Sequence, residues 1–292
     1  MKQFYVQQNE AGQRLDKLLL KILNKAPKSF IYKMLRKKNI TLNGKKADGS
    51  EKVALQDEIK LFLSDETIGQ FSEAVSVPET EADLDVIYED KHILIVNKPL
   101  GSLSQKAKKD DISMVELIIS YLLKKNEITR QQLASFTPAV CNRLDRNTSG
   151  LLIAGKSLSG LQEMARLLRN RNLSKYYLCI VKGDVTEKKS IEGYLTKDEE
   201  KNIVTIHPEQ TDASDYIRTE YEPLAYSKNL KGSYTLLQVK LITGRSHQIR
   251  AHLASIGHPL IGDYKYGDQK TNHFFKMNYG LNHQLLHSSR MV

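Results

Sequence analysis

The chain has 292 residues, 40% hydrophobic and 27% charged, which is typical of a folded globular protein and excludes a disordered or fibrous one. No apolar run approaches the roughly 18 residues needed to cross a bilayer, and its two cysteines, Cys141 and Cys179, are too few for a disulfide framework. The net charge of +10 favours a polyanionic partner. We expect a cytoplasmic protein that binds no membrane and has two domains.

The charge is distributed unevenly along the chain. Residues 1–63 carry 14 basic and 6 acidic side chains, whereas residues 64–90 carry 9 acidic and no basic ones. Within the acidic stretch, residues 64–83 have few large apolar side chains, which is the composition of a solvated linker. We therefore expect an N-terminal domain at 1–63, a mobile acidic linker at 64–83 and a large domain at 84–292.

The N-terminal segment predicts two basic amphipathic helices followed by a small sheet. Apolar residues recur at helical spacing from Leu15 to Leu23. A second apolar stripe follows Pro27. Residues 40–42 then lead into the tight-turn pair Asn43-Gly44, and residues 59–63 have the pattern of a strand. The second helix is bordered by four basic residues, Lys33, Arg36, Lys37 and Lys38.

This arrangement resembles the S4 RNA-binding domain over most of residues 12–63. In that family the two helices offer basic side chains to RNA, so the resemblance implies an RNA contact for Lys33, Arg36, Lys37 and Lys38. On their own, these four side chains fit a solvated helix face equally well. The turn and the strand that follow them favour the S4 interpretation.

The large domain is predicted to begin with a hairpin, because strand-like residues 86–88 and 93–96 flank a turn. A helix is expected at about 113–125 and a buried strand at 151–154. Before that strand lies a polar loop in which Asp145 stands between Arg143 and Arg146. Neighbouring cations favour the ionised form of a carboxylate, and an ionised, positioned carboxylate can act as a nucleophile or a base.

An aspartate between two arginines is more often a structural salt bridge or a turn former, so this loop alone does not assign chemistry to Asp145. Two later segments add context. A predicted helix at 158–171 precedes a strand at 175–183 that contains Tyr177. A second strand at 234–242 leads through Gly244 into a helix whose free backbone amides attract anions, which places Arg245 to meet a carboxylate or a phosphate.

Three motifs in order resemble the RluA-type family of pseudouridine synthases, over roughly residues 84–290. The first is Arg143-Leu144-Asp145-Arg146 with Thr148-Ser149-Gly150, and the second is Lys175 and Tyr177 with Gly183. The third joins Gly244-Arg245 and His247-Gln248-Ile249-Arg250 to residues 257–263. Asn142 and Ser246 depart from the family's usual His and Thr, but both keep hydrogen-bonding capacity.

The resemblance implies a role for each motif. Asp145 would attack the uridine, Tyr177 would stack against the flipped base, Arg245 would pair with the aspartate, and Arg143 would fill the space that the base leaves. These roles are physically reasonable, because a uridine must leave its stack before its glycosidic bond can be reached and an aromatic ring replaces some of the lost stacking.

The implied reaction breaks the bond from ribose to N1 and rebuilds it through C5, so it needs no cofactor and no metal. His247 and His252 are five residues apart and do not share a helix face, which also argues against a metal site. Arg146 is expected to hold the RNA backbone. Arg250 either contacts RNA phosphate or supports the loop that carries Arg245.

The expected architecture is α+β. A catalytic domain with a mixed, largely antiparallel sheet, whose topology comes from the resemblance, follows a small α+β S4-like domain. Residues 286–292 end where family members usually continue, which indicates either a truncated chain or a shortened C-terminal edge.

The expected partner is RNA, and the leading hypothesis is a monomeric synthase that acts on large-subunit ribosomal RNA. A tRNA-directed synthase and a noncatalytic RNA-binding or ribosome-assembly protein remain alternatives.

Overall fold

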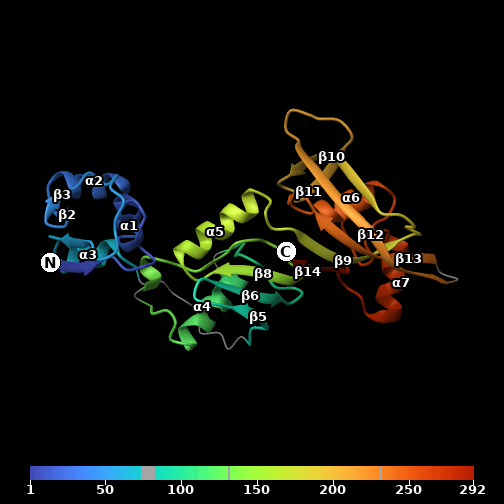
Figure 1. Cartoon of the computed structure of the whole chain (residues 1–292), viewed down its shortest axis with the longest axis horizontal. Helices are drawn as coiled ribbons and strands as arrows, with labels where there is room; N and C mark the ends of the chain where they lie inside the picture. The colour runs from blue at the N-terminus through green and yellow to red at the C-terminus, as the bar shows by residue number, and fades with distance from the viewer. Residues whose placement is uncertain (74–82, 109, 131, 230–231) are drawn as a thin grey trace.

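The computed structural model describes residues 1–73, 83–108, 110–130, 132–229 and 232–292. It contains an N-terminal module with a four-stranded sheet and a large module built on a ten-stranded sheet (Figure 1). The side chain of Asn9 accepts a hydrogen bond from the backbone N–H of Leu158, at 3.3 Å.

The N-terminal module packs its helices on a small sheet with strand order β1-β4-β2-β3. Leu15, Leu18 and Leu19 are fully buried, as the helical spacing predicts. Asn43 and Gly44 both have positive φ, 50° and 72°, and form the predicted tight turn. The elements are β1 (Lys2–Tyr5), α1 (Leu15–Ile22), α2 (Lys28–Arg36), β2 (Ile40–Leu42), β3 (Lys45–Lys46) and β4 (Glu58–Leu61).

A third helix, α3 (Asp65–Phe71), corrects the expected start of the linker at Ser64. Ser64 caps this helix by accepting a hydrogen bond from the backbone of Thr67. Ile68 is buried in the core of the module, and the ring of Phe71 lies 4.3 Å from that of Phe30. The acidic composition predicted a linker here, although these residues form a helix with one apolar face. The rest of the expected linker falls mainly on residues 74–82, outside the described residues.

The large sheet has the strand order β11-β10-β12-β13-β9-β14-β8-β6-β5, and β7 pairs with β8 beside it. Its strands are β5 (Val86–Glu89), β6 (Ile93–Lys98), β7 (Ala139–Val140), β8 (Ser149–Gly155), β9 (Lys175–Lys182), β10 (Lys189–Asp198), β11 (Ile203–His207), β12 (Asp215–Asn229), β13 (Gly232–Leu241) and β14 (Leu286–Met291).

Antiparallel pairing dominates this sheet, so the predicted mixed, largely antiparallel architecture is confirmed. Among the described strands only β14 and β8 run parallel. Of the two alternatives for the C-terminal residues, a shortened sheet edge is wrong, because β14 lies between β8 and β9 in the middle of the sheet. Gly150, with φ of 107°, allows the close approach: a Cβ there would lie 2.2 Å from the carbonyl oxygen of Ser288 on β14.

Helices from several parts of the chain complete the large module. They are α4 (Met114–Lys124), the short 3-10 helix at Gln132–Ala134, α5 (Leu158–Arg169), α6 (Gln248–Ser255) and α7 (Gln269–Tyr279). Apolar residues of α4 and α6 share one core with alternate residues of β6, β8, β9 and β13. Ile249 and Leu253 of α6 belong to the same core as Tyr177 and Cys179 of β9.

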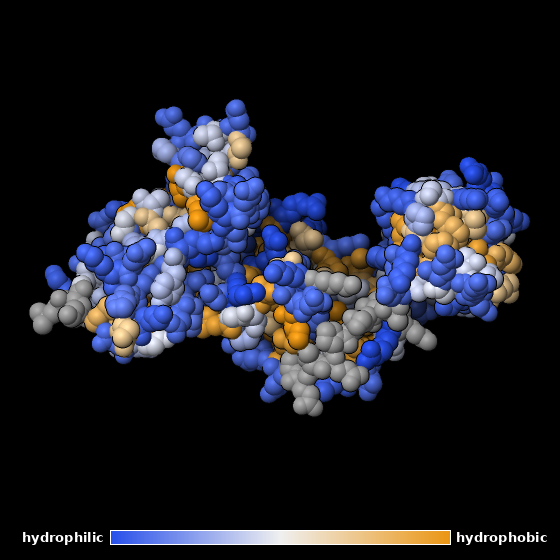
Figure 2. All heavy atoms as spheres, turned by 180° about the vertical axis from the view of Figure 1, so that it is seen from behind, coloured by the Kyte–Doolittle hydropathy of each residue, from blue (hydrophilic) through white to orange (hydrophobic). Residues whose placement is uncertain are grey.

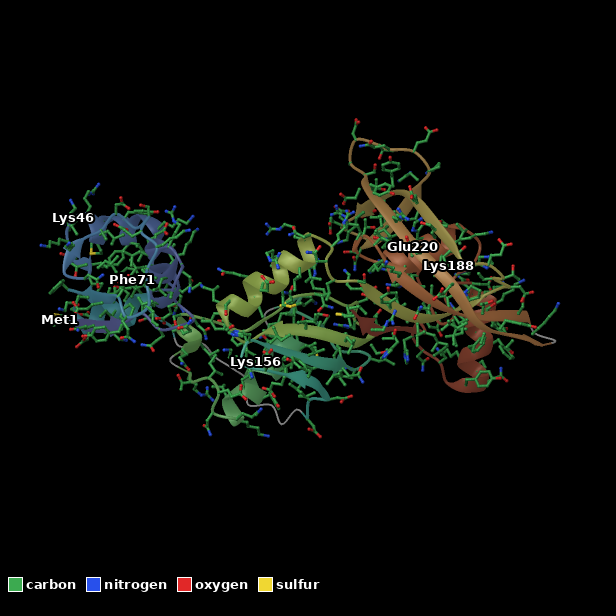
Figure 3. All side chains as sticks on the ribbon, viewed as in Figure 1. Met1, Lys46, Phe71, Lys156, Lys188 and Glu220 are labelled. Atoms are coloured by element: carbon green, nitrogen blue, oxygen red, sulfur yellow. The ribbon has the colours of Figure 1, made fainter. Side chains whose placement is uncertain are left out.

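A charged cluster ties the end of β8 to β5 and to the loop after α4. The ammonium of Lys156, labelled in Figure 3, contacts the carboxylates of Glu89 at 2.7 Å and of Glu127. Lys125 binds the same two carboxylates, each at 2.9 Å. Hydrogen bonds and charge from these lysines outweigh burial and hold the pKa of Glu89 at about 2. This network fixes the sheet without touching Asp145.

On the face shown in Figure 2, hydrophilic residues cover much of the surface, and apolar residues gather in the middle of the molecule and on the N-terminal module. Within the described ranges, no helix is both long enough and apolar enough to span a membrane.

Candidate active site

The loop that carries Asp145 is held at both ends and in its middle. The side chain of Asn142 accepts a hydrogen bond from the backbone of Ile153, at 2.8 Å. In the middle, the hydroxyl of buried Ser104 donates to the carbonyl of Leu144 and accepts from its N–H, at 2.8 and 3.0 Å. A turn closes when the N–H of Thr148 donates to the carbonyl of Asp145. These contacts fix the backbone on either side of the aspartate.

Lys98, at the end of β6, is the lysine beneath this loop. Its side chain is fully buried, and its ammonium donates to the carbonyls of Pro99, Ser102 and Arg146 at 3.0, 2.7 and 3.0 Å. Burial lowers the pKa of Lys98 to about 8, and the charge of Asp145 opposes that shift. Lys98 therefore fastens the backbone next to Asp145 to the loop after β6.

The carboxylate of Asp145 accepts a hydrogen bond from Nη1 of Arg250, at 2.9 Å. Arg250 uses its other two nitrogens for a bidentate contact with Asp263, at 2.7 and 2.9 Å. Burial disfavours the charge of Arg250, but the two carboxylates outweigh burial and raise its pKa further above the ordinary value. The side chain of Asp145 stays 28% exposed, against 9% for Arg250 and 0% for Asp263. The aspartate is thus positioned from one side and open on another.

Asp263 is itself rigidly placed. Its carboxylate also accepts the backbone N–H groups of Lys265 and Tyr266, at 2.9 and 3.1 Å. The preceding residue, Gly262, has φ of 77°, and a Cβ there would lie 2.1 Å from the carbonyl oxygen of His283. Burial raises the pKa of Asp263, but the bonds and charge of Arg250 outweigh burial and lower it. This carboxylate orients Arg250, and through it Asp145.

Tyr177 lies in β9 opposite Val239 of β13 and Ser288 of β14. Its side chain is 5% exposed and belongs to the core that includes Ile249 of α6. Burial raises the pKa of its phenol to about 12, and the charge of Asp145 acts in the same direction. The tyrosine is therefore a neutral aromatic group near the aspartate.

The start of α6 is built by Gln248. Its amide donates to the carbonyl of Arg218 and the hydroxyl of Thr219, both at 3.0 Å, and its oxygen accepts from Thr243 at 2.9 Å and from the N–H of Arg245 at 3.1 Å. These bonds join the 243–248 segment to β12. Because α6 begins at Gln248, Ile249 is buried in the core and Arg250 points to Asp145.

Comparisons with known proteins identify the family of this chain. Residues 92–255 match the RNA pseudouridylate synthase family, and residues 13–59 match the S4 domain family. The chain belongs to the RNA pseudouridylate synthase family. Membership makes it an isomerase that forms pseudouridine in RNA, and the expected α+β catalytic domain with an N-terminal S4 domain is confirmed.

Relatives match over nearly the whole chain. This chain is 32% identical over 291 residues to ribosomal large subunit pseudouridine synthase C of Escherichia coli, and the match covers 97% of this chain and 85% of that protein. It is 31% identical to an uncharacterised RNA pseudouridine synthase of Mycoplasma genitalium, covering 99% and 88%. Human RNA pseudouridylate synthase domain containing 1 has a similar fold, with a TM-score of 0.54, 21% identity and coverage of 72% and 78%.

The predicted pairing of Arg245 with Asp145 is wrong. Nη2 of Arg245 instead contacts Asp215 at the start of β12, at 2.8 Å, and both side chains are about half exposed, 51% and 50%. The reason is the helix boundary: Arg245 lies three residues before α6, whereas Arg250 lies inside its first turn. Arg250 was expected either to contact RNA phosphate or to support the loop that carries Arg245. The structure shows a supporting role, but the group that Arg250 supports is Asp145.

The remaining predicted RNA contacts lie on the surface. Arg143 and Arg146 flank Asp145 and are exposed. Four basic residues of the S4 domain, on α2 and just after it, are also exposed: Lys33, Arg36, Lys37 and Lys38. Contact with RNA stays a prediction for all six.

Sequence reasoning missed two residues and undervalued a third. Lys98 could have been found, because Leu94, Val96 and Lys98 alternate as inward-facing residues of β6, which puts a lysine in the core. Asp263, the last residue of the third motif, was assigned no catalytic role. His247 was considered only as a metal ligand; in the described part of the chain, no three His, Cys, Asp or Glu residues form a group that could hold a metal ion.

Proposed function

We propose that this enzyme isomerises specific uridines of large-subunit ribosomal RNA, with Asp145 as the nucleophile. The observation that carries the catalytic part is the position of Asp145: fixed by Arg250 at 2.9 Å, near Tyr177, and still 28% exposed. The ribosomal target is supported by the names of relatives such as the E. coli enzyme and by the S4 domain. A monomer in the cytoplasm is part of the same proposal.

Each residue has a task in this scheme. The flipped uracil stacks on the ring of Tyr177, which replaces part of the stacking lost from the RNA. Asp145 attacks the nucleotide while the bond from C1′ to N1 breaks. The uracil then turns, C5 bonds to C1′, the bond to Asp145 breaks and restores the carboxylate, C5 loses its proton and N1 gains one, so nothing is transferred to or from a cofactor. Arg250 keeps the carboxylate aimed at the substrate.

The exposed basic residues supply affinity for RNA. Arg143 and Arg146 lie on either side of Asp145 in the chain, where they can hold the phosphates next to the target, with Arg143 filling the space of the flipped base. Lys33, Arg36, Lys37 and Lys38 give the S4 domain a basic surface for the same RNA.

The target is tested by mapping pseudouridines in RNA from a deletion strain that is complemented by the wild type or by Asp145→Asn. We expect large-subunit ribosomal sites that disappear on deletion and return only with the wild type. Loss of tRNA sites alone would refute the ribosomal target. Sites restored by Asp145→Asn would refute the catalytic role of the aspartate.

A further inference from the structure

His247 is a buried histidine next to Asp145 that the scheme above does not use. Its side chain is 9% exposed, and its Nε2 lies 3.9 Å from Oδ2 of Asp145. It is the residue before α6 and has φ of 54°, a backbone conformation that costs energy for a residue other than glycine. This strained backbone conformation orients the ring of His247 toward Asp145.

The other ring nitrogen of His247 is engaged by Tyr266. The two atoms, Nδ1 and the tyrosine hydroxyl, are 2.8 Å apart. The same hydroxyl accepts the backbone N–H of Val204, at 2.9 Å, so its own hydrogen is available for Nδ1. In this arrangement Nδ1 accepts, and in a neutral ring the proton is carried by Nε2.

Burial keeps the ring neutral by lowering the pKa of His247 below its ordinary value of 6.5. The charged groups that face it come from three places. Asp145 is on the catalytic loop, Arg250 is on α6, and Asp263 and Lys265 precede Tyr266. The negative and positive groups shift the pKa of His247 in opposite directions, so burial remains the largest effect on that pKa. His247 therefore presents a neutral N–H on the side of Asp145.

This N–H is available to a ligand. At 3.9 Å, Nε2 is too far from Asp145 for a hydrogen bond, and among the described residues the ring hydrogen-bonds only through Nδ1. A donor beside the nucleophile would meet the nucleotide that Asp145 attacks. When the bond from C1′ to N1 breaks, negative charge spreads onto the uracil carbonyl oxygens, and a fixed donor stabilises such charge.

We propose that Nε2–H of His247 donates a hydrogen bond to a carbonyl oxygen of the target uracil and holds the base against Asp145. The proton stays on Nε2, so no proton transfer is involved. A neutral donor suits this place because a cationic ring would instead form an ion pair with Asp145. Tyr266 is the positioning residue, since its hydroxyl fixes which nitrogen carries the proton. This inference rests on the proposed role of Asp145.

The test compares His247→Leu, which removes the donor, with His247→Gln, which keeps an N–H donor. Steady-state kinetics on a ribosomal RNA fragment that contains the mapped uridine give kcat and KM separately. We expect His247→Leu to lower kcat by about 100-fold with little change in KM. His247→Gln should recover part of that loss, and Tyr266→Phe should fall between wild type and His247→Leu. His273→Leu, at an exposed position of α7, is the matched control and should behave as wild type.

A purely structural role predicts a different pattern. In that case His247→Leu and His247→Gln would lower the melting temperature equally and leave kcat of the folded fraction unchanged. Wild-type kcat in His247→Leu, with Asp145→Asn inactive, would overturn this inference and leave the proposed function standing. Activity in Asp145→Asn would overturn the proposed function itself.

Discussion

Arg250 holds Asp145 with one nitrogen, at 2.9 Å, while its other two bind buried Asp263. The two carboxylates share one guanidinium, and only Asp145 reaches solvent. The position of the nucleophile therefore depends on Asp263, which lies 118 residues further along the chain. Because a lysine presents a point charge rather than a planar fork, it cannot reproduce both contacts.

Arg250→Lys should consequently lower kcat by about 100-fold or more while RNA binding persists, because the charge remains but the aim of Asp145 is lost. Asp263→Asn should act in the same direction more weakly, since one oxygen can still accept from Arg250. Single-turnover kinetics and filter binding measure the two effects. Tight RNA binding with undiminished turnover in Arg250→Lys would contradict the role of this contact.

Arg245 should behave differently from Arg250, because its ion pair with Asp215 is half exposed and such pairs contribute about 0–1 kcal/mol. Arg245→Ala is expected to raise KM for RNA through the loss of one positive charge and to change kcat far less than Arg250→Lys does. Asp215→Ala is the control that breaks the same pair but keeps the cation. A collapse of kcat in Arg245→Ala alone would show that Arg245 does reach the reaction.

Lys98→Met should destabilise the fold and impair catalysis together. The substitution replaces a fully buried ammonium and leaves the carbonyl groups of Pro99, Ser102 and Arg146 without the donor that they share, which we expect to cost about 3 kcal/mol. Urea unfolding gives the free energy, and the rate of the folded enzyme reports the displacement of the Asp145 loop. Lys91→Met, at an exposed position, is the control. Equal stability of Lys98→Met and wild type would show that the ammonium does not fasten the loop.

Acid should destabilise the protein partly through His252. This side chain is 1% exposed, its Nδ1 lies 3.0 Å from the hydroxyl of Thr219, and burial lowers its pKa below 6.5. The unfolded chain therefore binds the proton first, so the contribution of His252 is complete above pH 6.5 and is lost as the pH falls through the lowered value.

The slope in that window is at most about 1.4 kcal/mol per pH unit for one group. Urea unfolding of the wild type and of His252→Gln at several pH values between 7 and 5 isolates this contribution from those of other groups. The variant should lose less stability over this range than the wild type does. Parallel curves would show that His252 is not the group responsible.

The loop of Asp145 and the strand of Tyr177 were predictable because their signals are local. Charge between two apolar runs marked the loop, and the strand pattern at 175–183 placed Tyr177 on a strand. The choice between Arg245 and Arg250 was not predictable in this way, since a shift of a few residues in the start of α6 decides which arginine faces Asp145. Helix boundaries are the least reliable part of a sequence-based prediction.

Long-range partners were also beyond the sequence. Nothing local to Asp263 shows that it binds Arg250, and nothing local to residues 286–291 shows that they enter the middle of the sheet between β8 and β9. Both facts depend on which segments meet in three dimensions. For helix α3 the sequence did contain a local signal, the capping residue Ser64. The acidic composition of this stretch led to the prediction of a linker instead.

The most direct test of the central claim is pseudouridine formation by purified Asp145→Asn. The asparagine keeps the size and an oxygen for Arg250 but removes the charge and the nucleophilicity. We predict undetectable product on a ribosomal RNA fragment that the wild type modifies, with RNA affinity retained and with full activity in Asp184→Asn, an exposed control. Pseudouridine formation by Asp145→Asn at the wild-type rate would contradict the account.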